Sequence, residues 1–419
     1  MIIHLPYGRA ALTASIPDEY PVDIIEAPAA PPAADPAGAV RYALDHLLGN
    51  TSWANFSGAR SAAVAINDKT RPVPHDLLLP PLLERLNALG IPDREITFYI
   101  AVGTHPPMDP AEFSSILPAE ILDRCRVVSH DSEDDKQMVY LGETGRGTPV
   151  WSNRSYVQAD LKIVVGNIEP HQFAGFSGGV KTAAIGLSSI KTINRSHALM
   201  THPDSRIGGY ESNPARQDIE EIGAKIGVHL ALNAILNHDR RIVYVLAGEP
   251  RAVMAAGLER CRQVSQVAVQ QPYRLVISSP GGHPKDINLY QAQKGLAHAA
   301  LITQTGGTVI LAAACPEGTG SPHYEDWMRD KHSYAEIMQR FHEEGFRIGP
   351  HKAYQIARDA SRVRLLFCSE LDHDLAQRLL LNPQSGLQQA IDRALAGLPP
   401  GERIAVLPHA ASTIPYLMK

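Results

Sequence analysis

The sequence has little cysteine, no excess of positive charge and no long apolar run. Its four cysteines lie far apart, at positions 125, 261, 315 and 368, and no two of them form a CxxC pair. The spacing therefore indicates neither a disulfide framework nor a thiolate zinc site. The formal net charge of -5 argues against a surface that binds nucleic acid. No run reaches the length of a membrane span, and residues 1–17 lack the apolar core of a secretion signal, so we expect a cytoplasmic protein without a membrane partner.

The expected fold class is α/β. At 419 residues, with 44% apolar and 20% charged residues, the chain is typical of a globular protein with two domains. After a hairpin pattern over residues 2–16 and a linker rich in Pro and Ala at 28–36, apolar strand patterns alternate with helical patterns. The alternation predicts two α/β domains with mostly parallel sheets, an N-terminal one at 1–270 and a C-terminal one at 271–419.

Polar side chains follow four of the strands expected in the first domain, at 61–66, 96–102, 126–128 and 161–165. These side chains are, in chain order, Asp68 and Arg71, then His105, then His130 and Asp131, and then Glu169 and His171. In open parallel sheets ligands bind outside the carboxyl ends of the strands, so these residues are expected to lie around one site. His130 and Asp131 belong to no motif, and a role in a turn fits them equally well.

The loop that follows the fourth of these strands contains a pair of glycines next to a lysine. Gly178 and Gly179 lack a Cβ, so their backbone can approach a ligand closely and direct N–H groups toward an anion. Lys181 adds a cation where a helix is expected to begin, and His197 lies on the helical pattern further along. The sequence thus predicts a phosphate-sized anion site beside an amine and imidazoles. The loop is not a P-loop, because Val180 stands where that motif needs glycine.

The second domain carries a further polar cluster after its first strand, at 274–278. The cluster includes Tyr290, Gln291 and Lys294. Because Tyr290 and Lys294 are four residues apart, they share one face of the helix expected there. A site between the two domains would use this face from one side and the glycine loop from the other.

These motifs together resemble the nickel-dependent lactate racemases and their relatives, the 2-hydroxyacid racemases and epimerases. The motifs that carry the resemblance are DKTRP (68–72), GTH (103–105), EPHxxAGFSGGxK (169–181), His197, NPxR (213–216) and KDINLYQAQKG (285–295). They run through about two-thirds of the chain. The resemblance implies an isomerase with two α/β domains and the active site in the cleft between them.

The resemblance also implies a cofactor, a nickel-pincer nucleotide: a pyridinium-3,5-bisthiocarboxylic acid mononucleotide that holds Ni(II) through two sulfur arms and a ring carbon. His197 would be the protein ligand of nickel, and Lys181 would be attached to the cofactor or contact it. His105 and His171 would be the paired acid/base residues. The remaining implied roles are cofactor binding by Asp68, Ser177, Gly178, Gly179, Tyr290 and Gln291, and substrate binding by Arg71 and Lys294. The implied partners are a small 2-hydroxyacid substrate and the proteins that make the cofactor and insert nickel.

The implied chemistry accounts for these residue types. The α-proton of a 2-hydroxyacid is poorly acidic, so the α-hydrogen leaves as hydride while a base takes the hydroxyl proton. Return of the hydride to the other face of the planar 2-oxo acid inverts the centre. Two imidazoles serve the two enantiomers, because each enantiomer presents its hydroxyl differently. The chain departs from the family pattern at Pro106, where the family often has arginine, and at Ile185-Gly186, where it commonly has Pro-Gly.

Two other functions are compatible with parts of the sequence. One is a metallohydrolase in which three histidines bind zinc and leave a position open for water. However, His105, His171 and His197 do not show the close pairing, such as HExxH, that is common in zinc sites. The other is a non-catalytic protein that stores or senses a mononucleotide.

Activity is predicted to depend on cofactor maturation. A host that lacks the machinery for the modified nucleotide cannot supply it, so protein made there should be folded and inactive. The measurement is racemase activity beside a circular dichroism spectrum. Full activity of that protein after addition of nickel salt alone would contradict the prediction.

Overall fold

The computed structural model describes residues 1–418 and divides into two compact units. One unit is formed by residues 29–264, and the other by residues 1–28 together with 265–419. This corrects the expected division at residue 270, which placed the first 28 residues in the N-terminal domain. They belong to the other unit because strand β3 (Val22–Ile24) pairs in parallel with strand β19 (Ile404–Leu407).

The unit of residues 29–264 is built on a six-stranded sheet with the strand order β13-β12-β9-β4-β5-β6. All neighbours are parallel except β12 and β13. The strands of this sheet are β4 (Ala62–Asn67), β5 (Ile96–Ala101), β6 (Arg126–Ser129), β9 (Leu161–Asn167), β12 (Leu230–Leu236) and β13 (Ile242–Gly248). Two hairpins lie outside the sheet, β7 (Met138–Glu143) with β8 (Pro149–Asn153), and β10 (Pro170–His171) with β11 (Gly175–Phe176).

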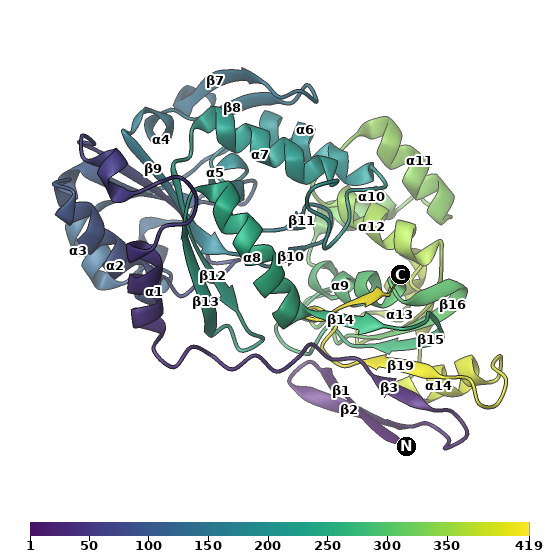
Figure 1. Ribbon diagram of the computed structural model, residues 1–419. Coiled ribbons are helices and arrows are strands. Elements are labelled where there is room, and N and C mark those ends of the chain that lie inside the picture. Colours follow the sequence, from purple (N-terminus) through teal and green to yellow (C-terminus); the bar gives the residue numbers. More distant parts are fainter. Residues whose placement is uncertain (419) are drawn as a thin grey trace. The chain divides into compact units, whose positions relative to one another are not determined.

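Helices cover both faces of this sheet. Figure 1 shows α1, α2 and α3 on one side and α5, α7 and α8 on the other. The helices of this unit are α1 (Pro36–Asp45), α2 (His75–Ala88), α3 (Ala119–Arg124), α4 (Arg154–Gln158), α5 (Lys181–Ala184), α6 (Ile190–Ala198), α7 (Pro214–Ile226) and α8 (Pro250–Ser265). Strand β9 is buried along its whole length, as expected for a central strand with helices on both faces.

The NPxR motif is the start of helix α7. The side chain of Asn213 caps the helix by accepting a hydrogen bond from the backbone N–H of Arg216, at 3.0 Å. Pro214 occupies the first turn, where its missing N–H has no cost. The helix ends at Gly227, whose φ of 75° is the left-handed conformation that favours glycine. The motif therefore places Arg216 in the first turn of α7, where its side chain is buried.

The unit of residues 1–28 and 265–419 has a six-stranded sheet that is parallel throughout, with the strand order β18-β17-β16-β15-β19-β3. Its further strands are β1 (Ile2–Tyr7), β2 (Ala10–Ser15), β14 (Gln266–Val269), β15 (Tyr273–Ser278), β16 (Thr303–Ala312), β17 (Arg364–Cys368), β18 (Pro383–Gln384) and β20 (Ile414–Leu417). Its helices are α9 (Leu289–Ala300), α10 (Pro322–Met328), α11 (Tyr334–Glu344), α12 (Pro350–Ala360), α13 (His373–Arg378) and α14 (Leu387–Leu395). The expectation of two α/β domains with mostly parallel sheets is confirmed.

All four cysteines are free and buried. Among residues 1–418, no helix is long and apolar enough to cross a membrane.

The N-terminal hairpin, β1 with β2, covers one face of the all-parallel sheet. Leu5 is fully buried in the same apolar cluster as Leu275 and Ile277 of β15. Ile2, on the same strand, is 64% exposed. The hairpin is therefore part of the core of this unit rather than an appendage.

Replacement of Leu5 tests this placement of the hairpin. We expect Leu5→Ala to lower the free energy of unfolding by about 2–5 kcal/mol, because it removes buried methyl groups and leaves a cavity. Ile2→Ala removes a similar side chain from the exposed side of the same strand and should have little effect. Urea denaturation of both variants gives the comparison, and equal effects would show that the hairpin is not packed as described.

Candidate active site

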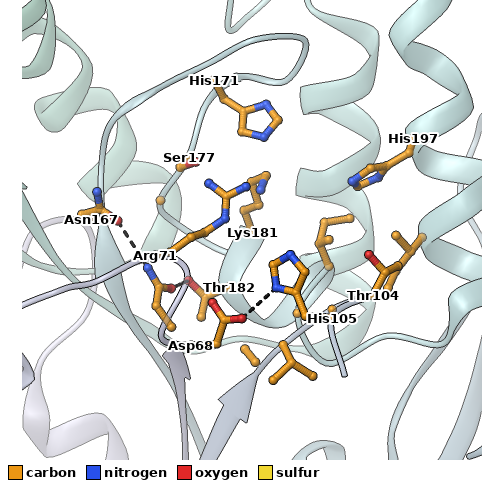
Figure 2. A pocket seen from close by; sticks show the side chains of 18 residues that line it. Asp68, Arg71, Thr104, His105, Asn167, His171, Ser177, Lys181, Thr182 and His197 are labelled. Carbon is orange, nitrogen blue, oxygen red and sulfur yellow. Dashed lines mark hydrogen bonds and ion pairs between the residues drawn. The ribbon is translucent and has the colours of Figure 1, made fainter. Parts of the chain in front are cut away.

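A cavity of about 120 Å³ lies at the carboxyl end of the sheet in the unit of residues 29–264. The loops that follow β4, β5 and β9 form its walls, together with helices α5 and α6 (Figure 2). Its lining includes eight of the residues singled out from the sequence: Asp68, Arg71, His105, His171, Ser177, Gly178, Lys181 and His197. Strands β9, β4 and β5 are neighbours in the sheet, so residues far apart in the sequence meet at one edge, as expected for a parallel sheet.

A buried carboxylate holds His105. Asp68 is 4% exposed, and its Oδ2 lies 2.7 Å from Nδ1 of His105, as the dashed line in Figure 2 shows. The other carboxylate oxygen, Oδ1, accepts from the hydroxyl of Thr70 at 2.8 Å. Burial acts to raise the pKa of Asp68, but the hydrogen bonds from His105 and Thr70 and the charge of Arg71 outweigh it and hold the pKa below its usual value of 3.8. Because the ionised carboxylate accepts from Nδ1–H, the neutral ring of His105 presents an unprotonated Nε2, as a general base requires.

The second histidine of the acid/base pair, His171, is held in the opposite tautomer. The backbone N–H of Ala174 donates to Nδ1 of His171 at 3.2 Å, so the proton of the neutral ring is on Nε2. The ring of Phe173 packs edge-on against His171 at 4.8 Å and against His197 at 5.0 Å, measured between ring centroids. In this form His171 presents a donor where His105 presents an acceptor. Phe173 was not identified from the sequence, because nothing in the motif shows that its ring separates two histidines.

Two nitrogen bases lie in an environment that favours their neutral forms. Burial lowers the pKa of Lys181 well below its usual value; the cations Arg71 and Arg216 lower it further, and Glu169 opposes them. Burial, with the charges of Lys181 and Arg71, lowers the pKa of His197 to about 3. A neutral imidazole has the lone pair that a metal ion needs, and a neutral amine is a nucleophile.

Arg71 carries a loose ion pair. Its Nη1 lies 3.6 Å from Oε1 of Glu169, and the two side chains are 45% and 44% exposed. Figure 2 shows Arg71 and Lys181 between the ring of His171 and the ring of His105. An anion that enters the cavity thus meets one exposed guanidinium, whose present partner is easily displaced.

Gly178 and Gly179 pack closely against the protein around them. The N–H of Gly179 donates to Oδ1 of Asn233 at 2.7 Å, so it is not directed at an anion. A Cβ at Gly179 would come within 2.7 Å of Met254, and a Cβ at Gly178 would come within 2.7 Å of Ile168. Both residues also have positive φ angles, of 57° and 92°. The missing Cβ atoms therefore serve the packing of the loop against the protein.

Arg216, which had no expected role, holds the glycine loop through its backbone oxygens. It is fully buried, and its guanidinium donates to the backbone oxygens of Phe176 at 2.9 Å and Gly178 at 3.1 Å. Nε of the same side chain donates to Glu220 at 3.0 Å, and the hydroxyl of Tyr210 donates to the same oxygen at 2.8 Å. The buried charge is thus paired and hydrogen-bonded, as its burial requires.

Polar residues at the strand ends complete the wall. Nδ2 of Asn67 donates to Oδ1 of Asn167 at 3.3 Å, which joins the ends of β4 and β9. Both amides and the hydroxyl of Thr182 line the cavity. Oγ of Ser177, also in the lining, is buried and has no hydrogen-bond partner among residues 1–418. A buried hydroxyl of this kind is available to a ligand that reaches it.

Two histidines that the sequence left open lie elsewhere. His130 is fully buried, and its Nε2 contacts the backbone oxygen of Ser188 at 3.1 Å, which is a structural role. His202 has a half-exposed side chain and does not line the cavity, whereas His197 does.

The remaining predicted residues belong to the other unit. Tyr290, Gln291 and Lys294 lie on α9, and Nζ of Lys294 is 3.2 Å from Oε1 of Gln291. The hydroxyl of Tyr290 is 3.2 Å from Nε2 of His351, and Nζ of Lys352 lies 4.4 Å from the centroid of its ring. Neither of these two α12 residues was identified from the sequence, since no local pattern connects α12 with α9.

The histidines do not form a zinc site by themselves. In residues 1–418, no three His, Cys, Asp or Glu side chains are grouped as ligands of one metal ion. A tetrahedral zinc site with an open position needs three such side chains. The three-histidine metallohydrolase therefore has no support in the geometry.

Two known domain families together match most of the chain. Residues 7–208 match the family described as lactate racemase N-terminal domain, and residues 268–414 match the lactate racemase C-terminal domain. The chain belongs to the lactate racemase family. It is therefore an isomerase, a racemase. A lactate racemase of Thermoanaerobacterium thermosaccharolyticum is 27% identical over 98% of each chain, and one of Lactiplantibacillus plantarum is 29% identical over 98% of this chain and 99% of its own.

A solved structure agrees with this membership. The lactate racemase apoprotein of Thermoanaerobacterium thermosaccharolyticum has a TM-score of 0.91 at 26% identity, with both chains covered in full. A Thermotoga maritima protein has a TM-score of 0.63 over 91% of this chain and 97% of its own. At 18% identity, this second similarity concerns the fold alone.

Loss of the Asp68 charge tests how His105 is held in this racemase. Asp68→Asn removes the carboxylate that selects the Nδ1–H tautomer, so we expect activity to fall by about 10²-fold or more. The pair also stabilises the fold. The pKa of Asp68 is lower in the folded protein than its usual value of 3.8. The stabilisation is therefore present above pH 3.8 and is lost as the pH falls through the lowered pKa.

The measurement is activity at neutral pH together with urea denaturation between pH 7 and pH 3. Asp76→Asn, at an exposed aspartate on α2, is the control and should leave activity unchanged. If Asp68→Asn is as active as the control, the carboxylate does not position the base.

Proposed function

We propose that the chain inverts the α-carbon of a 2-hydroxyacid, lactate or a larger one, with a nickel-pincer nucleotide as cofactor. The observation that carries this proposal is the meeting of His105, His171, His197, Lys181 and Arg71 around one cavity. Each of these residues belongs to a motif of the lactate racemase family. The two relatives described above are lactate racemases by name.

The residues present suit the cofactor. His197 offers a neutral imidazole, which is a donor that nickel accepts. The amine of Lys181 is nucleophilic in its neutral form, and the buried hydroxyl of Ser177 is available to a polar group of the nucleotide. When bound, the nucleotide supplies a pyridinium carbon that can accept and return a hydride.

The protein itself handles the charge and the hydroxyl proton of the substrate. Arg71 binds the carboxylate, since it is the exposed guanidinium in the cavity wall. His105 takes the hydroxyl proton through Nε2, because Asp68 keeps its Nδ1 protonated. His171 donates through Nε2–H to the C2 oxygen of the substrate, in the place where the other enantiomer presents its hydroxyl. To act as a base toward the other enantiomer, it must exchange its tautomer and give up the hydrogen bond from Ala174.

Two expectations complete the proposal. The protein works with the proteins that synthesise the nucleotide and insert nickel, and it does so in the cytoplasm. A panel of chiral 2-hydroxyacids, followed by loss of optical purity, identifies the substrate.

Three histidine variants test these roles together. His105→Ala and His171→Ala should each retain nickel and lose racemisation by about 10²–10⁴-fold, the usual effect of losing a positioned acid/base. His197→Ala should lose nickel, because its imidazole is the protein ligand assigned to the metal. His202→Ala, near His197 in the sequence and half-exposed, should keep both properties.

Nickel content by mass spectrometry is compared with activity across the four variants. Loss of nickel in His105→Ala or His171→Ala, with His197→Ala fully loaded, would refute these assignments.

A further inference from the structure

Glu169 has no role in the mechanism above, yet it is the carboxylate that pairs with Arg71, a residue of the cavity wall. Its Oε1 lies 3.6 Å from Nη1 of Arg71, and its charge also acts on Lys181. Asp68, which lines the cavity, is committed to His105 and Thr70. Glu169 is therefore the carboxylate that competes with an incoming anion for Arg71.

The geometry of this ion pair indicates that Arg71 can exchange Glu169 for another anion. A separation of 3.6 Å is longer than a charge-assisted hydrogen bond of about 2.7–2.9 Å, and both side chains are nearly half exposed. An exposed ion pair of this kind changes an equilibrium constant, here that of a competing anion binding to Arg71, by only about 1.4- to 5-fold. A carboxylate that reaches Arg71 in a bidentate geometry would replace Glu169 without a large cost.

The displaced charge then influences what else can bind. Once Arg71 is taken by a substrate carboxylate, the charge of Glu169 is no longer compensated by that guanidinium. A second carboxylate on the substrate would meet this charge, whereas an uncharged substituent would not. Lys181 offers little compensation, because the proposed function assigns it to the cofactor.

We propose that Glu169 is a specificity-determining residue: it occupies Arg71 in place of the substrate carboxylate and discriminates against 2-hydroxyacids that carry a second carboxylate. The inference rests on the proposed function and names its substrate class, monocarboxylic 2-hydroxyacids with an uncharged substituent.

Charge-neutral substitution of Glu169 tests the inference. The purified full-length chain and its variants are titrated calorimetrically with lactate, which has one carboxylate, and with malate, which has two. In Glu169→Gln, binding of both acids should tighten, and binding of malate should tighten more, so that the preference for lactate over malate falls by about two- to fivefold. Glu169→Asp keeps the charge and should keep most of the preference.

The control is Glu84→Gln, which removes a negative charge from an exposed position on α2 and should change neither affinity. Thermal unfolding confirms that each variant is folded, and racemisation of both acids by the loaded enzyme gives a second measure of the same preference. Equal changes for the two acids, or weaker binding of both in Glu169→Gln, would overturn the inference while the proposed function stands. If the unsubstituted enzyme neither binds nor racemises any 2-hydroxyacid, the proposed function fails and the inference fails with it.

Discussion

The site depends on one constraint, the parallel pairing of β9, β4 and β5. In the register of β4 and β5, Asn67 lies opposite Ala101, so the residues that follow each strand emerge side by side. This brings Asp68 within hydrogen-bond distance of His105. A shift of one residue in the pairing would turn alternate side chains to the other face and separate the carboxylate from the imidazole. The apolar packing of the strands thus determines the geometry of the acid/base pair.

Charge is the second constraint on the site. Two basic side chains, Arg71 and Lys181, line a small cavity, and a third, Arg216, lies buried next to its glycine loop. Arg216 is tolerated there because Glu220 and two backbone oxygens satisfy it. Burial first, and the neighbouring positive charges second, lower the pKa of Lys181 and of His197. Arg71, whose ion pair with Glu169 is loose, is the cation that an anionic ligand can bind.

The sequence predicts the strand ends well and the partners across the fold poorly. His105 and Asp68 could be placed at strand ends from apolar patterns, but their hydrogen bond depends on strand order, which no local pattern contains. The absence of Cβ at Gly179 is visible in the sequence, whereas the atom that fills the space belongs to Met254 of α8. In the same way, β3 is a short strand whose partner, β19, lies near the other end of the chain. Long-range pairing of this kind follows from the collapse of the whole unit and is not encoded beside either strand.

Two buried charged residues, Asp68 and Arg216, hold the groups that face the cavity. Asp68 is 4% exposed, while the side chain of His105, which it orients, is 46% exposed. Arg216 is fully buried, while the loop that it fixes presents Ser177 and Lys181 to the cavity. Breaking a hydrogen bond of a buried charge is costly, so the holding residues stay in place when a ligand binds. The reacting residues have weaker ties to the protein and can exchange them for the ligand. The strong interactions of the fold thus orient the side chains of the site, which is the condition for electrostatic preorganisation of an active site.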